Sequence, residues 1–535
     1  MASLVFTPFG GLVPKADPLA LPANAAQIAM NCRVSSGMLE AFRSPLEVYN
    51  PTTPGLSTIY RFGQMTDSDV DHWFSFTKTV DVVKGAISND TEEITYYTGD
   101  GYPKVTKSDM ALTSRPYPAG YYRLGLPAPT FTPVATVTGS ASSDTAIAET
   151  RFYIYTFVSS LGEESAPSEP SNEVTFLNGQ SVTLILGAVP SGAYSVASKR
   201  IYRTAVGSSA TQYLLVAEIP GASVAYEDTV LAAALGEVCP SIDYAQLPDA
   251  ARGLVSMPNG MMAAHTDYDV YFCAPYKPYA WPVAYMQTVD YPLVGLGSFG
   301  SSLAVLTTGF PYVMTGTDPS SVSSEKLPVA YACLSKKSIV SSMGGVMYAA
   351  ADGLVIIDST GAKVISDDYF TRREWSALKP SSMMCAVWDE RIFVFYDNGT
   401  SRGGYIFAND GLTTTDIYAT AAFTDPVTGS LFLCVDDKIV KWDSGLAGKF
   451  QWKSRRRQVP IPKNFSYGQV LASVYPVTVN IYADGVLMNS QAVADDSSFR
   501  LPSGFRARYW EIELLGSERV FMVVIADTIE ELHGD

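Results

Sequence analysis

Short apolar runs separated by turn residues follow one another along almost the whole chain. Residues 151–158 form the run Arg-Phe-Tyr-Ile-Tyr-Thr-Phe-Val, and residues 520–525 form the run Val-Phe-Met-Val-Val-Ile. Runs of about four to eight residues rich in β-branched and aromatic side chains are typical of strands. The 41 glycines, 33 prolines and 32 tyrosines fit many short strands joined by tight turns. Long runs of Ala, Leu, Glu and Lys are nearly absent, so we predict an all-β fold.

One pattern of two apolar strands joined by a turn repeats within residues 246–450. Its copies begin at Asn259, Gly300, Gly344, Asp389 and Thr428. Their spacing is roughly 39 to 45 residues, which is the period of β-propeller blades. A blade cannot bury both of its faces alone, so several blades must stack around an axis. With a further blade from residues 51–127, we predict a β-propeller of about five to six blades. A long meander or two packed sheets is the alternative.

The remaining regions are separated by changes in composition. Residues 51–127 are expected to form the first blade region, and residues 246–450 the other blades. Residues 128–245 follow a Pro-rich stretch and hold about seven short strands, which predicts an inserted β-sandwich. The motifs of this sandwich region resemble those of fibronectin type III modules. Residues 451–535 are expected to form a C-terminal β-domain.

Residues 1–50 are expected to form an irregular docking segment with one short helix. Within residues 23–33, small or apolar side chains recur at helical spacing, which predicts the helix there. The segment lacks the basic start of a signal peptide, and prolines and glycines interrupt its apolar residues. No stretch of the sequence approaches the ~20 apolar residues that span a bilayer, so we expect no membrane anchor.

The formal net charge of -16 argues against a protein that binds nucleic acid by its sequence, and it remains compatible with a channel through which DNA slides without adhering. The six cysteines are scattered without C-x-x-C spacing and there are only three histidines, so we predict no metal site and no cofactor. Asp67, Asp69 and Asp71 alternate as at the start of a Ca²⁺-binding loop. His72 and Lys78 stand where that loop needs Gly and Glu, so an acidic exposed loop is expected.

No arrangement of residues typical of an enzyme stands out. Residues 295–300 match G-x-G-x-x-G, but a strand-like run follows them, so we interpret the glycines as a turn between blades. No G-x-S-x-G elbow accompanies the histidines. We therefore predict no catalytic residue and no enzymatic activity. Paired carboxylates leave no pattern in a sequence, so a polysaccharide-degrading propeller stays open as an alternative.

The strongest basic cluster of the chain is the run Arg455, Arg456 and Arg457. It has two interpretations. One is a solvated loop or strand edge. The other is a contact with acidic residues of a neighbouring subunit, which we favour in so acidic a protein.

The first 45 residues carry a spaced pattern of glycine, proline, asparagine and arginine. Its members are Gly10-Gly11, Pro14, Asp17-Pro18, Leu21-Pro22, Asn31-Cys32, Ser36-Gly37, Leu39-Glu40 and Arg43-Ser44-Pro45. This pattern resembles the opening of the tail nozzle proteins, also called tail tubular protein B, of short-tailed bacteriophages. The match covers under a tenth of the chain.

The resemblance implies a virion structural protein. Subunits of that family form a homohexameric tube below the adaptor ring of the portal, and the tube retains double-stranded DNA and then conducts it without sequence recognition. The implied partners are copies of the chain itself, the adaptor ring, and tail fibres or spikes. The implied location is the virion tail, after assembly in the host cytoplasm. A propeller-based receptor-binding tail protein is the alternative.

From this pattern and the basic cluster we predict a subunit or adaptor interface. The residues assigned to it are Gly11, Pro14, Asn31, Gly37, Arg43, Arg455, Arg456 and Arg457.

Overall fold

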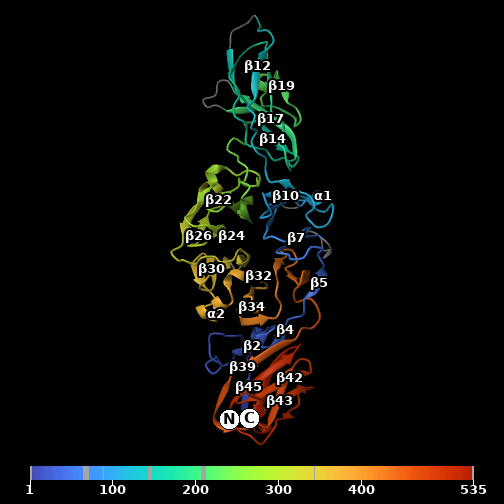
Figure 1. The fold of residues 1–535 in the computed structure, drawn as a ribbon, viewed down its shortest axis with the longest axis vertical. Helices are drawn as coiled ribbons and strands as arrows, with labels where there is room; N and C mark the ends of the chain where they lie inside the picture. The colour runs from blue at the N-terminus through green and yellow to red at the C-terminus, as the bar shows by residue number, and fades with distance from the viewer. Residues whose placement is uncertain are drawn as a thin grey trace. The chain divides into compact units, whose positions relative to one another are not determined.

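The fold is described from a computed structural model, which covers residues 3–63, 72–87, 90–142, 148–205, 212–342 and 344–532. Figure 1 shows a chain built mainly of strands, and the α-helices in these ranges are α1 (Ser108–Ala111) and α2 (Arg372–Ala377). The predicted all-β class is confirmed. The chain divides into two compact units. Unit 1 is Met1–Lys78, Leu306–Pro311 and Leu327–Asp535, and unit 2 is Thr79–Val305 and Tyr312–Lys326.

Unit 2 contains three four-stranded antiparallel sheets. The first has the order β11-β10-β9-β8 and starts in the chain with β8 (Asp81–Lys84). The second has the order β20-β21-β22-β23 and starts with β20 (Arg252–Ser256). The third is the sheet β24-β25-β26-β27, which starts with β24 (Leu293–Phe299). The first strand of the middle sheet, β20, lies beside both β8 and β24. The other strands are β9 (Thr95–Thr98), β10 (Lys104–Thr106), β11 (Tyr122–Arg123), β21 (Met262–His265), β22 (Asp269–Phe272), β23 (Gln287–Thr288), β25 (Ser302–Thr307), β26 (Tyr312–Thr315) and β27 (Ser323–Lys326).

Two three-stranded sheets between residues 134 and 228 of unit 2 share one apolar core. Tyr153, Tyr155 and Phe157 of one sheet are buried with Val182 and Leu184 of the other. These side chains alternate along their strands, as expected where two sheets pack face to face. The strands are β12 (Val134–Thr138), β16 (Ser181–Ile185) and β19 (Ala225–Asp228), then β14 (Tyr153–Ser159), β17 (Val196–Thr204) and β18 (Tyr213–Pro220). The short pair β13 (Ala148–Arg151) and β15 (Val174–Leu177) lies outside both sheets.

Unit 1 contains sheets of the same kind. The first strands β28 (Val340–Ser342), β32 (Met384–Trp388) and β36 (Ala421–Thr424) lie beside one another in this order, and β6 (Thr58–Arg61) follows β36. β6 pairs only with β7 (Trp73–Phe76) in the described residues. The remaining strands are β29 (Gly345–Ala349), β30 (Leu354–Asp358), β31 (Gly361–Val364), β33 (Arg391–Asp397), β34 (Arg402–Ala408), β35 (Gly411–Thr415), β37 (Leu431–Val435) and β38 (Lys438–Lys441).

The N-terminal segment joins three different sheets of unit 1. β5 (Leu46–Tyr49) completes the sheet of β36, β37 and β38 by pairing with β38. β2 (Ala26–Met30) lies between β35 and β39 (Phe450–Ser454), so one ten-stranded sheet runs from β32 into the C-terminal region. β1 (Ser3–Phe6) pairs with β46 (Val520–Ala526).

The C-terminal region supplies the other strands of these two sheets. The long sheet ends in β45 (Ala507–Gly516), β42 (Val477–Ala483) and β43 (Val486–Val493), and β40 (Arg457–Lys463) also pairs with β45. The second sheet has the order β1-β46-β41-β44, with β41 at Tyr467–Ala472 and β44 at Phe499–Arg500. Short strands β3 (Cys32–Arg33) and β4 (Glu40–Ala41) form a small hairpin.

The predicted helix within residues 23–33 is wrong. Residues 26–30 form β2, and its pairing with β39 contains a bulge between Ala26 and Ile28. The bulge adds one residue, so the buried side chains of Ala26 and Ala29 are three positions apart in a strand. This spacing imitates helical periodicity, and the segment is too short to be a stable helix without tertiary contacts.

The interpretation of residues 295–300 as a turn between blades is also wrong. Gly295 and Gly297 lie inside β24. Gly300 has a φ of 53° and makes the turn between β24 and β25, which belong to the same sheet. A strand follows the glycines, so the helix N-terminus that a dinucleotide site requires is not formed there.

Candidate interaction site

All eight predicted interface residues lie in unit 1, in or against the N-terminal segment. Gly11 is fixed by its neighbours on both sides. The Leu12 N–H donates to the Leu412 carbonyl at 2.7 Å, and the Ala26 N–H donates to the Gly11 carbonyl at 2.9 Å. A Cβ atom on Gly11 would come within 2.5 Å of the Leu412 oxygen. Glycine is therefore required at this position for the close approach of two backbones.

Asn31 and Gly37 shape the turns of the same segment. Asn31 has a φ of 55°, and its N–H donates to the Thr414 carbonyl at 2.7 Å. Its side-chain amide donates to an Asp416 carboxylate oxygen at 2.9 Å. Gly37 has a φ of 77°, which favours glycine, and its carbonyl accepts the Phe9 N–H at 2.9 Å.

The three arginines bond to their own chain. The Arg455 guanidinium donates to the Leu21 carbonyl at 3.0 Å, and the Arg457 guanidinium donates to the Ala23 carbonyl at 3.4 Å. Arg456 donates to Glu511 at 3.1 Å. Two of the three guanidinium groups thus hold residues 21–23 of the N-terminal segment against the start of β40.

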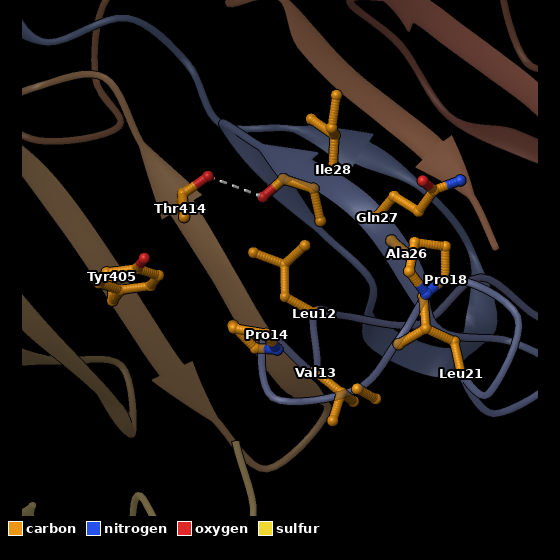
Figure 2. A pocket seen from close by; sticks show the side chains of 12 residues that line it. Leu12, Val13, Pro14, Pro18, Leu21, Ala26, Gln27, Ile28, Tyr405 and Thr414 are labelled. Atoms are coloured by element: carbon orange, nitrogen blue, oxygen red, sulfur yellow. Dashed lines mark hydrogen bonds between the residues drawn. The ribbon is translucent and has the colours of Figure 1, made fainter. Parts of the chain in front are cut away.

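Pro14 lies at a hollow of about 500 Å³ in unit 1. Figure 2 shows the hollow between the N-terminal segment, β2 and the strands β34 and β35, with the Thr414 hydroxyl donating to the Ala29 carbonyl at 3.2 Å. Its lining is largely apolar and has no charged side chain. Residues that line it include Leu12, Pro14, Leu21, Ile28, Tyr405 and Thr414.

Arg43 lines a second, smaller hollow of about 270 Å³ in unit 1, together with Asn31. The Arg43 side chain is exposed, and its backbone N–H donates to Asp443 at 2.7 Å. This hollow lies between residues 43–45 and the loop 443–449, so we call it the Arg43 hollow. The structure therefore brings Asn31 and Arg43 together at one hollow. Gly11 and Gly37 instead allow a close backbone contact and a turn.

Groups that could do chemistry are scarce in the described ranges. No cluster of three or more His, Cys, Asp or Glu side chains able to hold a metal ion occurs within them. All six cysteines are buried and free. Burial raises the pKa of Cys273 and of Cys333 to about 12, which keeps these thiols protonated and unreactive. Asp67, Asp69, Asp71 and His533 lie outside the described residues.

Buried charges in the region 148–241 could not be recognised from the sequence. Asp228 is fully buried, accepts the Tyr153 hydroxyl at 2.7 Å and pairs with Arg203. Glu163 is also buried, and burial raises its pKa to about 7. In the sequence, Glu163 and Asp228 look like the acidic residues that are common in turns. Only the structure, in which distant segments pack over them, shows that they are buried.

No protein-family model matches the chain, and no curated protein matches it. Among solved structures, the N-terminal domain of Nup159 is similar at 10% identity, covering 59% of this chain and 86% of that chain with a TM-score of 0.23. Hsv2 of Kluyvelomyces marxianus is similar at 11% identity, covering 50% of this chain and 71% of that chain with a TM-score of 0.24. Both neighbours are propeller-like.

A third similar structure is PorZ of Porphyromonas gingivalis, at 9% identity, covering 89% of this chain and 82% of that chain with a TM-score of 0.25. The helices in the described ranges are too short to cross a bilayer.

Proposed function

We propose that this chain is a structural subunit of the tail nozzle of a short-tailed bacteriophage. Copies of it form a homohexameric tube below the adaptor ring, retain the genome and conduct double-stranded DNA during ejection. The observation that carries the proposal is the spaced glycine, proline, asparagine and arginine pattern of residues 10–45. No enzymatic activity, metal or cofactor is part of this function.

The proposed architecture is a propeller of about five to six blades with an inserted fibronectin III-like sandwich and a C-terminal β-domain. Four of the four-stranded sheets support it, because they have the up-and-down strand order of a blade: those that start with β8, β20, β24 and β28. β5 also supports it, since an N-terminal strand completes the sheet of β36, β37 and β38. This pairing ties residues 46–49 to residues 438–441 without a covalent link.

In the proposed tube, the N-terminal segment is the part that meets the adaptor or a neighbouring subunit. Its strands enter three sheets, and Gly11, Asn31 and Gly37 fix its path by the hydrogen bonds given above. The arginine run 455–457 supports the proposal indirectly, because it holds residues 21–23 in place. The net charge of -16 supports a conduit that repels the DNA phosphates.

Native mass spectrometry of the chain mixed with its adaptor ring tests the proposal. Six copies bound per adaptor ring is the expected result. A complex with another number of copies, or a chain that stays monomeric and releases sugar from host polysaccharide, would favour the alternative of a receptor-binding or polysaccharide-degrading propeller.

A further inference from the structure

The Arg43 hollow has walls that the backbone holds in place. The loop 443–449 is pressed against residues 42–45, where the Leu446 carbonyl accepts both the N–H of Ser44 at 2.9 Å and its hydroxyl at 3.1 Å. A Cβ atom on Gly448 would come within 1.9 Å of the Phe42 carbonyl oxygen. Such close packing makes this hollow a formed feature of the fold.

The hollow presents two cations that have no acid partner. Arg43 and Lys449 both line it and both are exposed. Among the described residues, neither the Arg43 guanidinium nor the Lys449 ammonium group makes an ion pair. The protein is acidic overall, with 53 Asp and Glu against 37 Lys and Arg.

Within the described ranges, neither of the two acids nearest the hollow pairs with Arg43 or Lys449 through an ion pair. Asp416 accepts the Asn31 side-chain amide at 2.9 Å. Asp443 pairs with the Arg33 guanidinium and also accepts the Arg43 N–H at 2.7 Å. The cations of the hollow are therefore available to an anion from outside the chain.

Trp442 adds a hydrogen-bond donor. It lines the same hollow, its side chain is 3% exposed, and its Nε1–H has no acceptor among the described residues. Buried donors are usually satisfied in proteins, so the Trp442 N–H gains a hydrogen bond if an acceptor reaches it from the hollow. A carboxylate can accept from guanidinium, ammonium and indole groups together.

We propose that the Arg43 hollow binds an aspartate or glutamate side chain from an acidic segment of a partner protein. Charge complementarity selects this occupant, since the lining has two cations, Arg43 and Lys449, against one acid, Asp416. Leu446, which is 84% exposed at the tip of the neighbouring loop, contacts an apolar residue beside that carboxylate. The inference extends the proposed function by naming the chemistry of its partner, but the binding itself does not depend on ring formation.

The test uses the purified full chain and two short peptides. One is acetyl-Gly-Leu-Glu-Glu-Leu-Gly-amide, and the other carries Gln in place of both Glu residues. Two-dimensional ¹H–¹⁵N NMR follows the tryptophan indole signals, and the signal missing from Trp442→Phe identifies Trp442. The glutamate peptide is expected to shift the Trp442 indole proton downfield, whereas the glutamine peptide is not.

The variant R43E/K449E is expected to weaken glutamate-peptide binding by about tenfold or more. Its matched control is R506E/R508E, which makes the same change in charge at two exposed arginines elsewhere in unit 1 and should bind as the original chain does. Circular dichroism checks that both variants are folded, and Arg43→Gln repeats the test with a smaller change.

Equal shifts from both peptides, an unmoved Trp442 signal, or equal weakening by the control variant would overturn the proposal. If rings of six subunits form while the peptide fails to bind, only this inference is refuted. If the peptide binds as expected while no ring forms, only the nozzle function is refuted.

Discussion

Glu163 should make the stability of the residue 134–228 sandwich depend on pH. This residue is 5% exposed and lies in the turn after β14, where the Glu163 N–H donates to the Ser159 hydroxyl at 3.1 Å. Burial is the largest influence on the pKa of this carboxyl, and the hydrogen bond with the Ser159 side chain opposes it only in part. Burial thus raises the pKa of Glu163 from 4.5 to about 7.

The size of the effect follows from that pKa. Below pH 4.5 the carboxyl is protonated in both the folded and the unfolded chain, so it costs nothing. Between pH 4.5 and about 7 the unfolded chain ionises this carboxyl while the folded chain keeps it protonated, so stability falls across that range. Above about pH 7 both states are ionised and no further loss follows. The change in pKa corresponds to about 3 kcal/mol between pH 4.5 and pH 8.

The perturbation is Glu163→Gln, which keeps the shape of the protonated acid and cannot ionise. Hydrogen–deuterium exchange of the β14 amides (Tyr153–Ser159) reports the free energy of local opening. The two proteins should exchange alike at pH 4.5. At pH 8 the Gln variant should open roughly 100-fold less often, as ~3 kcal/mol requires.

Other carboxyls titrate in the same range, but they are common to both proteins and cancel in the comparison. Glu173→Gln removes a charge from an exposed site in the same region and is the matched control. A difference between Glu163→Gln and the original chain that is constant from pH 4.5 to pH 8 would refute the reasoning. So would a Gln variant that loses stability relative to the original chain as the pH rises.

Two further predictions concern the N-terminal segment. Gly11→Ala should lower the free energy of unfolding by about 1–3 kcal/mol in denaturant titrations, because its Cβ would lie 2.5 Å from the Leu412 carbonyl oxygen. The control is Gly403→Ala, which should change this free energy much less because its Cβ would make an ordinary 3.4 Å contact. Equal losses in the two variants would contradict this reasoning. Replacing Arg455, Arg456 and Arg457 together by Ala should speed hydrogen exchange in residues 18–30 and leave the β14 amides unchanged, since the guanidinium groups of Arg455 and Arg457 hold residues 21–23. Unchanged exchange in residues 18–30 would refute this prediction.

The repeated pattern of the sequence located the central strands of the sheets. The copies starting at Gly300, Gly344 and Thr428 coincide with the pairs β25–β26, β29–β30 and β37–β38. Each pair is the middle of a four-stranded sheet, where apolar side chains are needed on both faces. The outer strands could not be recognised because they contain few apolar residues. In β27 (Ser323–Lys326), for example, the sequence is Ser-Ser-Glu-Lys and all four residues are exposed.

The N-terminal segment could not be predicted in the same way. Its strands pair with partners some 400 to 500 residues away, as with Leu46 and Lys441 or Ser3 and Ala526. No local sequence pattern predicts such pairings. The bulge in β2 also gives its buried residues a spacing that is typical of a helix. The glycine pattern was nevertheless informative, because Gly11 stands where a side chain would collide with a neighbouring backbone.

The candidate site, like the fold, could be predicted only in part. The sequence singled out Asn31 and Arg43 as interface residues, and both line the Arg43 hollow. It did not identify Trp442 or Lys449, because a lone tryptophan after an apolar strand is usually a core residue. Their role follows only from the packing of the loop 443–449 on residues 42–45.

Negative-stain imaging of the chain in its virion, or bound to its adaptor ring, tests the central claim most directly. The account predicts a six-fold ring with a central channel below the portal, in line with the path of the DNA. A peripheral position on the tail, or a compact particle without a channel, would contradict it and would favour a receptor-binding or polysaccharide-degrading protein.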